Sequence, residues 1–109
     1  MIPRILLDTA QIPDGDTLRL IQRGDEFSII LGANELMNSR LSGSEEALAK
    51  LSCERILPRA NARMLIGGLG MGFTLRAALP LMDDDAQIVV AELVPAVVDW
   101  AKGPMAGLH

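Results

Sequence analysis

Four glycines fall within six residues of this chain: Gly67, Gly68, Gly70 and Gly72. They directly follow the apolar run 64–66, and Glu92 ends the next apolar run, 86–91. A strand that leads into a glycine-rich turn and a helix lets the backbone approach a ligand closely. A carboxylate at the end of the following strand can accept hydrogen bonds from ribose hydroxyls. This order of residues therefore predicts a nucleoside-binding half-site.

The glycine spacing separates two classes of nucleotide ligand. A dinucleotide fingerprint requires GxGxxG, whereas the chain has GxGxG, with Phe73 where the third glycine of the fingerprint would be. The GKS or GKT ending of a phosphate-binding P-loop is also absent. A nucleoside with a short charged tail fits better than NAD, with its tail over the loop and its ribose on Glu92. The alternative is structural, in which the glycines only make a tight turn and Glu92 is only an acid at a strand end.

From Arg63 onward the hydrophobic pattern indicates alternating strands and helices. We expect a short strand before the glycines, a helix over about residues 71–80, a strand at 87–91 and a helix starting near Pro95. This βαβα order implies a right-handed crossover and a parallel pair of strands. The aspartates at 83–85 precede the second strand, where we expect solvated turn residues and not metal ligands.

The first 40 residues have the pattern of a small antiparallel sheet. The apolar runs 18–22 and 27–31 are separated by a polar segment with a glycine, which is typical of a hairpin. A second turn precedes residues 35–37, so residues 17–38 predict a three-stranded meander, with residues 3–8 as a candidate fourth strand. Such a small sheet needs a partner surface.

A helix is expected between this meander and the glycine-rich region. Ser42 and Glu45 have the spacing of a capping box and predict a helix that begins near Ser44 and ends before Pro58. Its apolar stripe at helical spacing consists of Ala47, Leu48, Leu51 and Ile56. The pattern also places the single cysteine, Cys53, in this helix as a buried or half-buried thiol.

Together these patterns predict an α/β fold with three parts. Residues 1–41 form an N-terminal β-meander, residues 42–62 a capped helix and a linker, and residues 63–109 the first βαβα half of a Rossmann-like domain. In the final helix, Trp100 is interpreted as a core anchor, with stacking on an adenine as the alternative. His109 is the only histidine and stands at the end of the chain, where a catalytic role is not expected.

Composition and charge exclude several other classes of protein. Half of the 109 residues are hydrophobic and only 3% are aromatic, which suits an aliphatic α/β core. The net charge is −4, and neither half of the chain has an excess of basic residues, so no nucleic-acid partner is expected. The opening residues do not have the pattern of a signal peptide, and no apolar run approaches the ~20 residues of a membrane span. A cytoplasmic protein that does not contact membranes is the expectation.

The segment 64–99 resembles the first half of a class I S-adenosylmethionine-dependent methyltransferase domain. The resemblance lies in the runs 66–72 (IGGLGMG) and 89–94 (VVAELV). A preceding β-meander, followed by residues 35–40 and 43–47, narrows it to spermidine synthase-like proteins. The resemblance implies that Gly68, Gly70, Gly72 and Glu92 bind S-adenosylmethionine or its decarboxylated form. It also implies transfer of an aminopropyl or methyl group to a small nucleophile.

The chain departs from the pattern of that family at two places. Polyamine synthases carry an aspartate inside the glycine loop that contacts the amine of the cofactor, and Gly70 stands at that position here. Their Tyr-His pair at the start of the helix has no equivalent among residues 43–45.

The catalytic aspartate of the family would fall beyond His109, so no catalytic residue is assigned and the chain resembles a family member truncated at its C-terminus. We expect two parallel strands to leave an open sheet edge, through which the chain would form a homo-oligomer or another association. Two other hypotheses stay open. One is a non-catalytic fragment or interaction module that keeps the glycine loop for structure, and the other is an NAD-dependent oxidoreductase.

Overall fold

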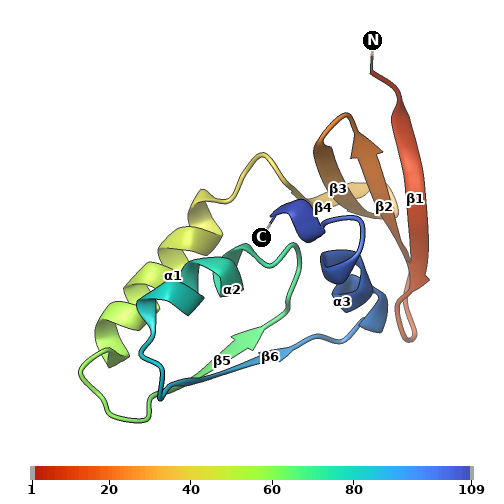
Figure 1. The fold of residues 1–109 in the computed structure, drawn as a ribbon. Coiled ribbons are helices and arrows are strands. Elements are labelled where there is room, and N and C mark those ends of the chain that lie inside the picture. The colour runs from red at the N-terminus through yellow and green to blue at the C-terminus, as the bar shows by residue number, and fades with distance from the viewer. Residues whose placement is uncertain (1, 109) are drawn as a thin grey trace.

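In the computed structural model, which describes residues 2–108, the chain begins with a four-stranded antiparallel meander (Figure 1). The strands follow one another in the order β1 (Arg4–Gln11), β2 (Thr17–Arg23), β3 (Glu26–Leu31) and β4 (Asn34–Asn38). The expected meander is therefore confirmed, and the candidate strand at residues 3–8 belongs to it as β1. Gly24 and Gly32 each occupy the first central position of a two-residue turn, with φ of +62° and +59°. Glycine adopts this conformation without steric cost.

Side chains alternate between the two faces of the meander, as the period of a strand requires. In β2, Leu18 and Leu20 are buried and belong to the core, whereas Arg19 and Arg23 line the opposite face. Phe27 in β3 points to the same side as the two leucines. The meander thus has an inner apolar face and an outer face that carries charged residues.

Helix α1 (Gly43–Ile56) follows the meander and ends before Pro58, as expected. The capping box is wrong, because Ser42 makes no side-chain cap hydrogen bond. Its hydroxyl instead donates to the Glu46 carboxylate at 3.0 Å. With its hydroxyl bound there, Ser42 leaves the first N–H groups of α1 without this cap, and the helix begins at Gly43.

The expected apolar stripe of α1 is also wrong. Leu48 and Leu51 are 60% and 62% exposed, and the buried residues of α1 are Ala49 and Cys53. These small side chains form a cluster with Ala78 of the next helix, so α1 and α2 meet through small residues and not through leucines. Small residues let two helix backbones approach closely. The expectation that Cys53 is buried is confirmed, and its burial raises the pKa of the thiol.

The second half of the chain has the expected βαβα order. Strands β5 (Arg63–Gly67) and β6 (Gln87–Ala91) are parallel, and α2 (Phe73–Ala78) with the short 3₁₀ helix η1 (Leu79–Leu81) connects them. Helix α3 (Pro95–Lys102) and the 3₁₀ helix η2 (Ala106–Leu108) complete the described chain. Helix α2 is shorter than the expected 71–80, because residues 70–72 belong to the glycine turn and the chain tightens to a 3₁₀ helix at 79–81.

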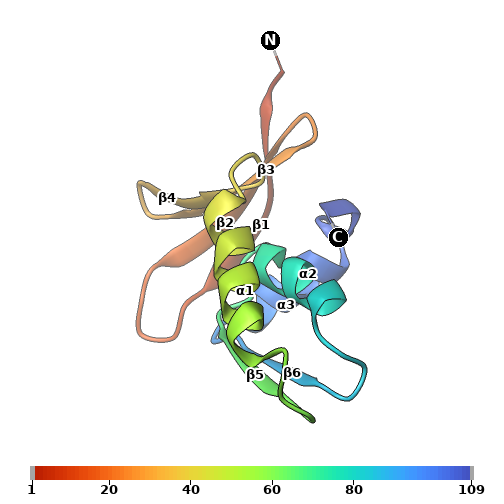
Figure 2. The same cartoon turned by 90° about the vertical axis from the view of Figure 1, so that its left-hand side faces the viewer.

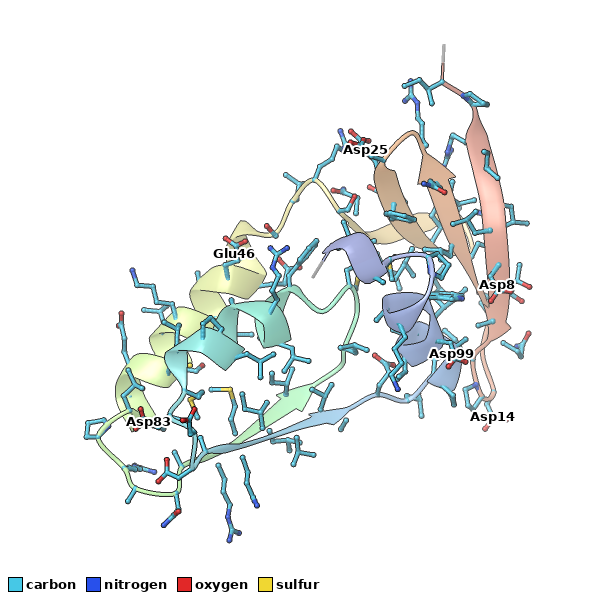
Figure 3. All side chains as sticks on the ribbon, viewed as in Figure 1. Asp8, Asp14, Asp25, Glu46, Asp83 and Asp99 are labelled. Carbon is cyan, nitrogen blue, oxygen red and sulfur yellow. The ribbon has the colours of Figure 1, made fainter. Side chains whose placement is uncertain are left out.

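The main core joins the inner face of the meander to α3 and to the residues around the glycine turn. Its buried members are Leu18, Leu20, Phe27, Ile29, Met71, Phe73, Val94, Val97, Trp100 and Met105. Trp100 is only 2% exposed, and its indole N–H donates to the Asp8 carboxylate at 2.8 Å. Figure 3 shows Asp8 on β1 beside α3. Trp100 is therefore a core anchor, as expected, and it ties the two halves of the molecule together.

Helix α3 packs against the meander, whereas α1 and α2 lie along one face of the β5–β6 pair (Figures 1 and 2). The radius of gyration of 15.2 Å exceeds the ~13 Å of a compact chain of this length. On the face of the β5–β6 pair turned away from the helices, Leu65 and Val89 are 71% and 58% exposed, and the nearby Leu93 is 70% exposed. Association through this pair of strands stays a prediction. No helix within residues 2–108 is long and apolar enough to cross a membrane.

Candidate functional site

The glycine loop between β5 and α2 has the backbone conformation that only glycine adopts easily. Gly68, Gly70 and Gly72 have φ of +86°, +54° and +80°, respectively. The N–H of Gly68 donates to the carbonyl oxygen of Ala91 at 2.7 Å, so the loop is joined to the end of β6. A side chain at any of these three positions would be strained, because L-residues rarely adopt positive φ. The positive φ values thus explain why glycine stands at these three positions.

Glu92 lies directly beside this loop, at the carboxyl end of β6. One oxygen of its carboxylate accepts the N–H of Leu69 at 2.7 Å and that of Gly70 at 3.4 Å. Its other oxygen accepts the N–H of Val94 at 3.1 Å. Tertiary structure therefore brings the four expected residues, Gly68, Gly70, Gly72 and Glu92, into one place. A carboxylate has about four acceptor sites, so Glu92 retains some capacity for a further donor.

A hollow of about 370 Å³ opens between the glycine loop, the inner face of the meander and the start of α1. Its walls are largely apolar, with Leu18 and Ile29 from the meander and Phe73 from α2 among them. Among the described residues that line it, the charged ones are Glu45 and Glu92. The hollow therefore favours a ligand with an apolar body and a positive charge.

Met37 of β4 reaches over the loop at Gly70. A Cβ atom added to Gly70 would lie 2.9 Å from both Sδ and Cε of Met37, closer than carbon atoms approach in real structures. The aspartate that polyamine synthases carry at this position would therefore require Met37 to move and would also need a φ of +54°. The positive φ is thus the main reason for a glycine at residue 70, because Met37 contacts it only through the flexible end of its side chain.

Two residues of this hollow escaped the sequence reasoning. The sequence predicts Met37 only as part of a strand, and Glu45 only as the partner of Ser42 in a capping box. Neither residue lies near the glycines in the sequence, and each reaches the loop because separate elements pack together. The one feature of the sequence that pointed to these contacts was the small meander, which was expected to pack against a partner surface.

The other residues that the sequence singled out lie elsewhere. Trp100 is inside the core, and His109 lies outside the described residues. The aspartates at 83–85 lie at the far end of the strand pair, where Asp83 is labelled in Figure 3. The carboxylate of Asp85 accepts the N–H of Asn61 at 2.7 Å and so fixes a turn. Among residues 2–108, no group of three or more His, Cys, Asp or Glu side chains could hold a metal ion.

No protein-family model matches the chain, and no curated protein matches it. The solved spermidine synthase from Thermotoga maritima matches 94% of the chain with a TM-score of 0.70 and 20% identity. The fold of the chain is similar to that of the matching part of this spermidine synthase.

At this identity the likeness establishes the fold and not the reaction. The chain spans about a third of the length of that spermidine synthase, 35%. The resemblance seen in residues 64–99 is therefore confirmed at the level of the fold, and the fold class of a meander followed by a Rossmann-like half is confirmed with it.

Proposed function

We propose that this chain forms the S-adenosyl-ligand-binding part of a spermidine synthase-like transferase. The main support for this proposal is that the glycine loop, with its positive φ values, and Glu92 lie at one hollow in a chain whose fold is similar to part of a spermidine synthase. In this proposal Gly68, Gly70 and Gly72 let the backbone approach the ligand, and the free acceptor capacity of Glu92 takes a ribose hydroxyl.

Glu45 is proposed to meet the charged tail of the ligand. It lines the same hollow as the loop, while Gly70 leaves no carboxylate within the loop itself. Because the hollow is lined by two acidic side chains, a tail that ends in an ammonium group suits it better than a tail that also carries a carboxylate. This favours the decarboxylated cofactor, and with it aminopropyl transfer, over S-adenosylmethionine and methyl transfer.

Such a transfer needs little covalent help from the protein. The lone pair of a small nucleophile attacks the carbon bound to the positive sulfur, the C–S bond breaks, and its electron pair stays on sulfur as a neutral thioether. An amine nucleophile must also lose a proton to a base. The residues of this chain would hold and orient the sulfonium ligand, which is the positioning part of the reaction.

Calorimetric titration with three ligands tests this proposal. Methylthioadenosine, which lacks the charged tail, should bind through the nucleoside site alone. Decarboxylated S-adenosylmethionine should bind more tightly than methylthioadenosine. The affinity of S-adenosylmethionine should exceed that of methylthioadenosine by a smaller factor. Absence of heat with all three ligands, from a folded sample, would overturn the proposal.

The variant Glu45→Gln separates the two parts of the site. It should remove the advantage of the decarboxylated cofactor over methylthioadenosine and leave methylthioadenosine binding unchanged. Glu54→Gln, an exposed change of the same charge on the same helix, is the control. An equal loss of affinity in Glu45→Gln and Glu54→Gln would show that Glu45 does not belong to the site.

The variant Glu92→Gln tests the ribose contact. It keeps an oxygen acceptor for the Leu69 N–H and removes the negative charge, so binding of all three ligands should weaken by about tenfold, on the scale of one charged hydrogen bond. Urea unfolding of the same variant reports how far the loop itself is loosened. Unchanged affinity would remove Glu92 from the site.

The competing hypothesis is an interaction module that keeps the loop for structure. Its argument rests on the Glu92 carboxylate, which accepts three backbone N–H groups of the protein itself. Under this hypothesis the folded chain gives no heat with S-adenosyl ligands and self-associates in sedimentation experiments.

A further inference from the structure

The outer face of the meander forms a second hollow, of about 670 Å³, on the side away from the glycine loop. Four arginines and two glutamates line it: Arg4, Arg19, Arg23, Arg40, Glu26 and Glu35. The chain as a whole has ten basic and fourteen acidic residues, so four of its ten positive charges gather at this one place. The hollow is thus locally positive in a protein of net charge −4.

Strand register places like charges directly opposite each other in this hollow. Arg4 of β1 pairs with Arg23 of β2, and both side chains line the same face. Like charges at directly opposed positions destabilise a sheet. Glu26 pairs with Arg23 across the next strand and lies 3.4 Å from the Arg40 guanidinium. Arg4, Arg23 and Arg40 thus outnumber Glu26 at this end of the hollow, which leaves an excess of positive charge there.

The arginines also converge from opposite edges of the sheet. Hydrogen bonds from Ser28 and Asn38 hold the pKa of Glu35 below its usual value, and the charges of Arg40 and Arg4 lower that pKa further. Arg4 belongs to β1, at one edge, whereas Arg40 follows β4, at the other. Both edges of the meander thus contribute charge to the same hollow.

Several of these side chains are held in place by the protein itself. A guanidinium nitrogen of Arg19 donates to the carbonyl oxygen of Gly32 at 2.9 Å, and Nε of Arg23 donates to that of Ile2 at 3.2 Å. The floor beneath them is apolar, because Ile21 and Ile30 lie there with only 8% and 7% exposure. Each guanidinium has five N–H donors, so donors stay available after these contacts. Arginine donors fixed in advance lose little entropy when they bind an anion.

We propose that this hollow binds a small oxyanion with two or more negative charges, held by Arg4, Arg23 and Arg40. Phosphate and carboxylate groups share the planar or branched oxygen geometry that guanidinium groups recognise. A small anion fits better than an extended polyanion, because Glu26 and Glu35 interrupt the positive surface on either side. Bound anion would offset the repulsion between Arg4 and Arg23.

Titration at low salt with two probes, inorganic tripolyphosphate and citrate, tests this inference. At least one probe should bind with saturable heat, and the ranking of the two identifies the preferred oxyanion. The double variant Arg4→Gln/Arg23→Gln should weaken binding at least tenfold. Arg55→Gln/Arg59→Gln removes the same charge from exposed positions in and just after α1 and should leave binding unchanged. Absence of saturable binding, or equal loss in both double variants, would overturn the inference.

Thermal unfolding supplies a second measurement that does not depend on calorimetric heat. Tripolyphosphate or citrate should raise the Tm of the unmodified chain, because a ligand that binds only the folded state stabilises it. Without anion, Arg4→Gln should keep or raise the Tm, and the anion should then raise it less. A lower Tm for Arg4→Gln without anion, together with an undiminished response to anion, would contradict the site. Binding of methylthioadenosine at the glycine loop should be the same in all these variants, so failure here is distinct from failure of the proposed function.

Discussion

The two faces of the meander carry two hollows of opposite character. The inner face meets the glycine loop and α1, and the charged residues among the described lining of that hollow are Glu45 and Glu92. The outer face carries four arginines. Strands place successive side chains on opposite faces, so Leu18 lines the inner hollow while Arg19 and Arg23 line the outer one. One short sheet can therefore present a surface for a cation and a surface for an anion within a few residues.

The hollows also differ in how they are built. The inner one depends on backbone conformation, at glycines that are close together in the sequence and have positive φ. The outer one depends on the register between strands, which sets Arg4 against Arg23. Substitutions at the inner face should consequently change stability strongly, and substitutions at the outer face should change charge and binding with little effect on stability.

The largest effect is expected at Trp100, which supports the inner face. Trp100→Ala should lower the free energy of unfolding by about 3–5 kcal/mol, because it leaves a large cavity in the shared core. Trp100→Phe fills most of that space but loses the hydrogen bond to Asp8, so its loss should be smaller. Arg19→Gln on the outer face should stay within about 0.5 kcal/mol. Urea unfolding measures all three, and a similar loss for Trp100→Ala and Arg19→Gln would break the contrast between the faces.

A graded series at the glycine loop is expected to have the next largest effect. Gly70→Ala combines a positive φ with a Cβ placed 2.9 Å from the flexible end of Met37, which must shift, and should cost about 1–3 kcal/mol. Gly68→Ala meets no atom within 4 Å and carries only the strain of its φ, about 1–2 kcal/mol.

Gly67→Ala is the matched control for this series. It has neither a close neighbour within 4 Å nor a positive φ, and should have little effect. Urea unfolding gives the order of the three variants. Recovery of part of the Gly70→Ala loss by Met37→Ala would identify the contact directly, and equal losses at 67 and 70 would contradict it.

The smallest effect is expected in the titration of Glu35, on the outer face. The pKa of Glu35 is lowered chiefly by the Ser28 hydrogen bond, so Ser28→Ala should raise that pKa towards its usual value. Because the pKa is lower in the folded state than in the unfolded state, the stability from Glu35 is present above the unfolded pKa and is lost as the pH falls through the folded pKa. Carbon-detected NMR titration of the carboxyl group measures this shift, with Ser52→Ala on α1 as the control. An unchanged pKa in Ser28→Ala would show that the Asn38 hydrogen bond and the arginine charges lower the pKa without Ser28.

Much of the fold could be predicted from local sequence patterns. The hairpin of β2 and β3, the end of α1 before Pro58 and the βαβα order each follow from runs of neighbouring residues. The failures were the Ser42 cap and the buried face of α1. Both depend on contacts that a helical pattern does not contain. Leucines at helical spacing predict an apolar stripe, but they do not predict that Ala49 and Cys53 will form the contact with α2.

The sequence by itself determined the order of elements, the alternation within the strands and the glycine turn between β5 and α2. These features are encoded by periodicity and by glycine conformation, which act over a few residues. Only the tertiary structure decided that Met37 covers Gly70, that Glu45 enters the same hollow and that Arg4 faces Arg23. Those contacts join residues from separate elements, and their geometry depends on strand register and on how closely the elements pack, which no local pattern specifies.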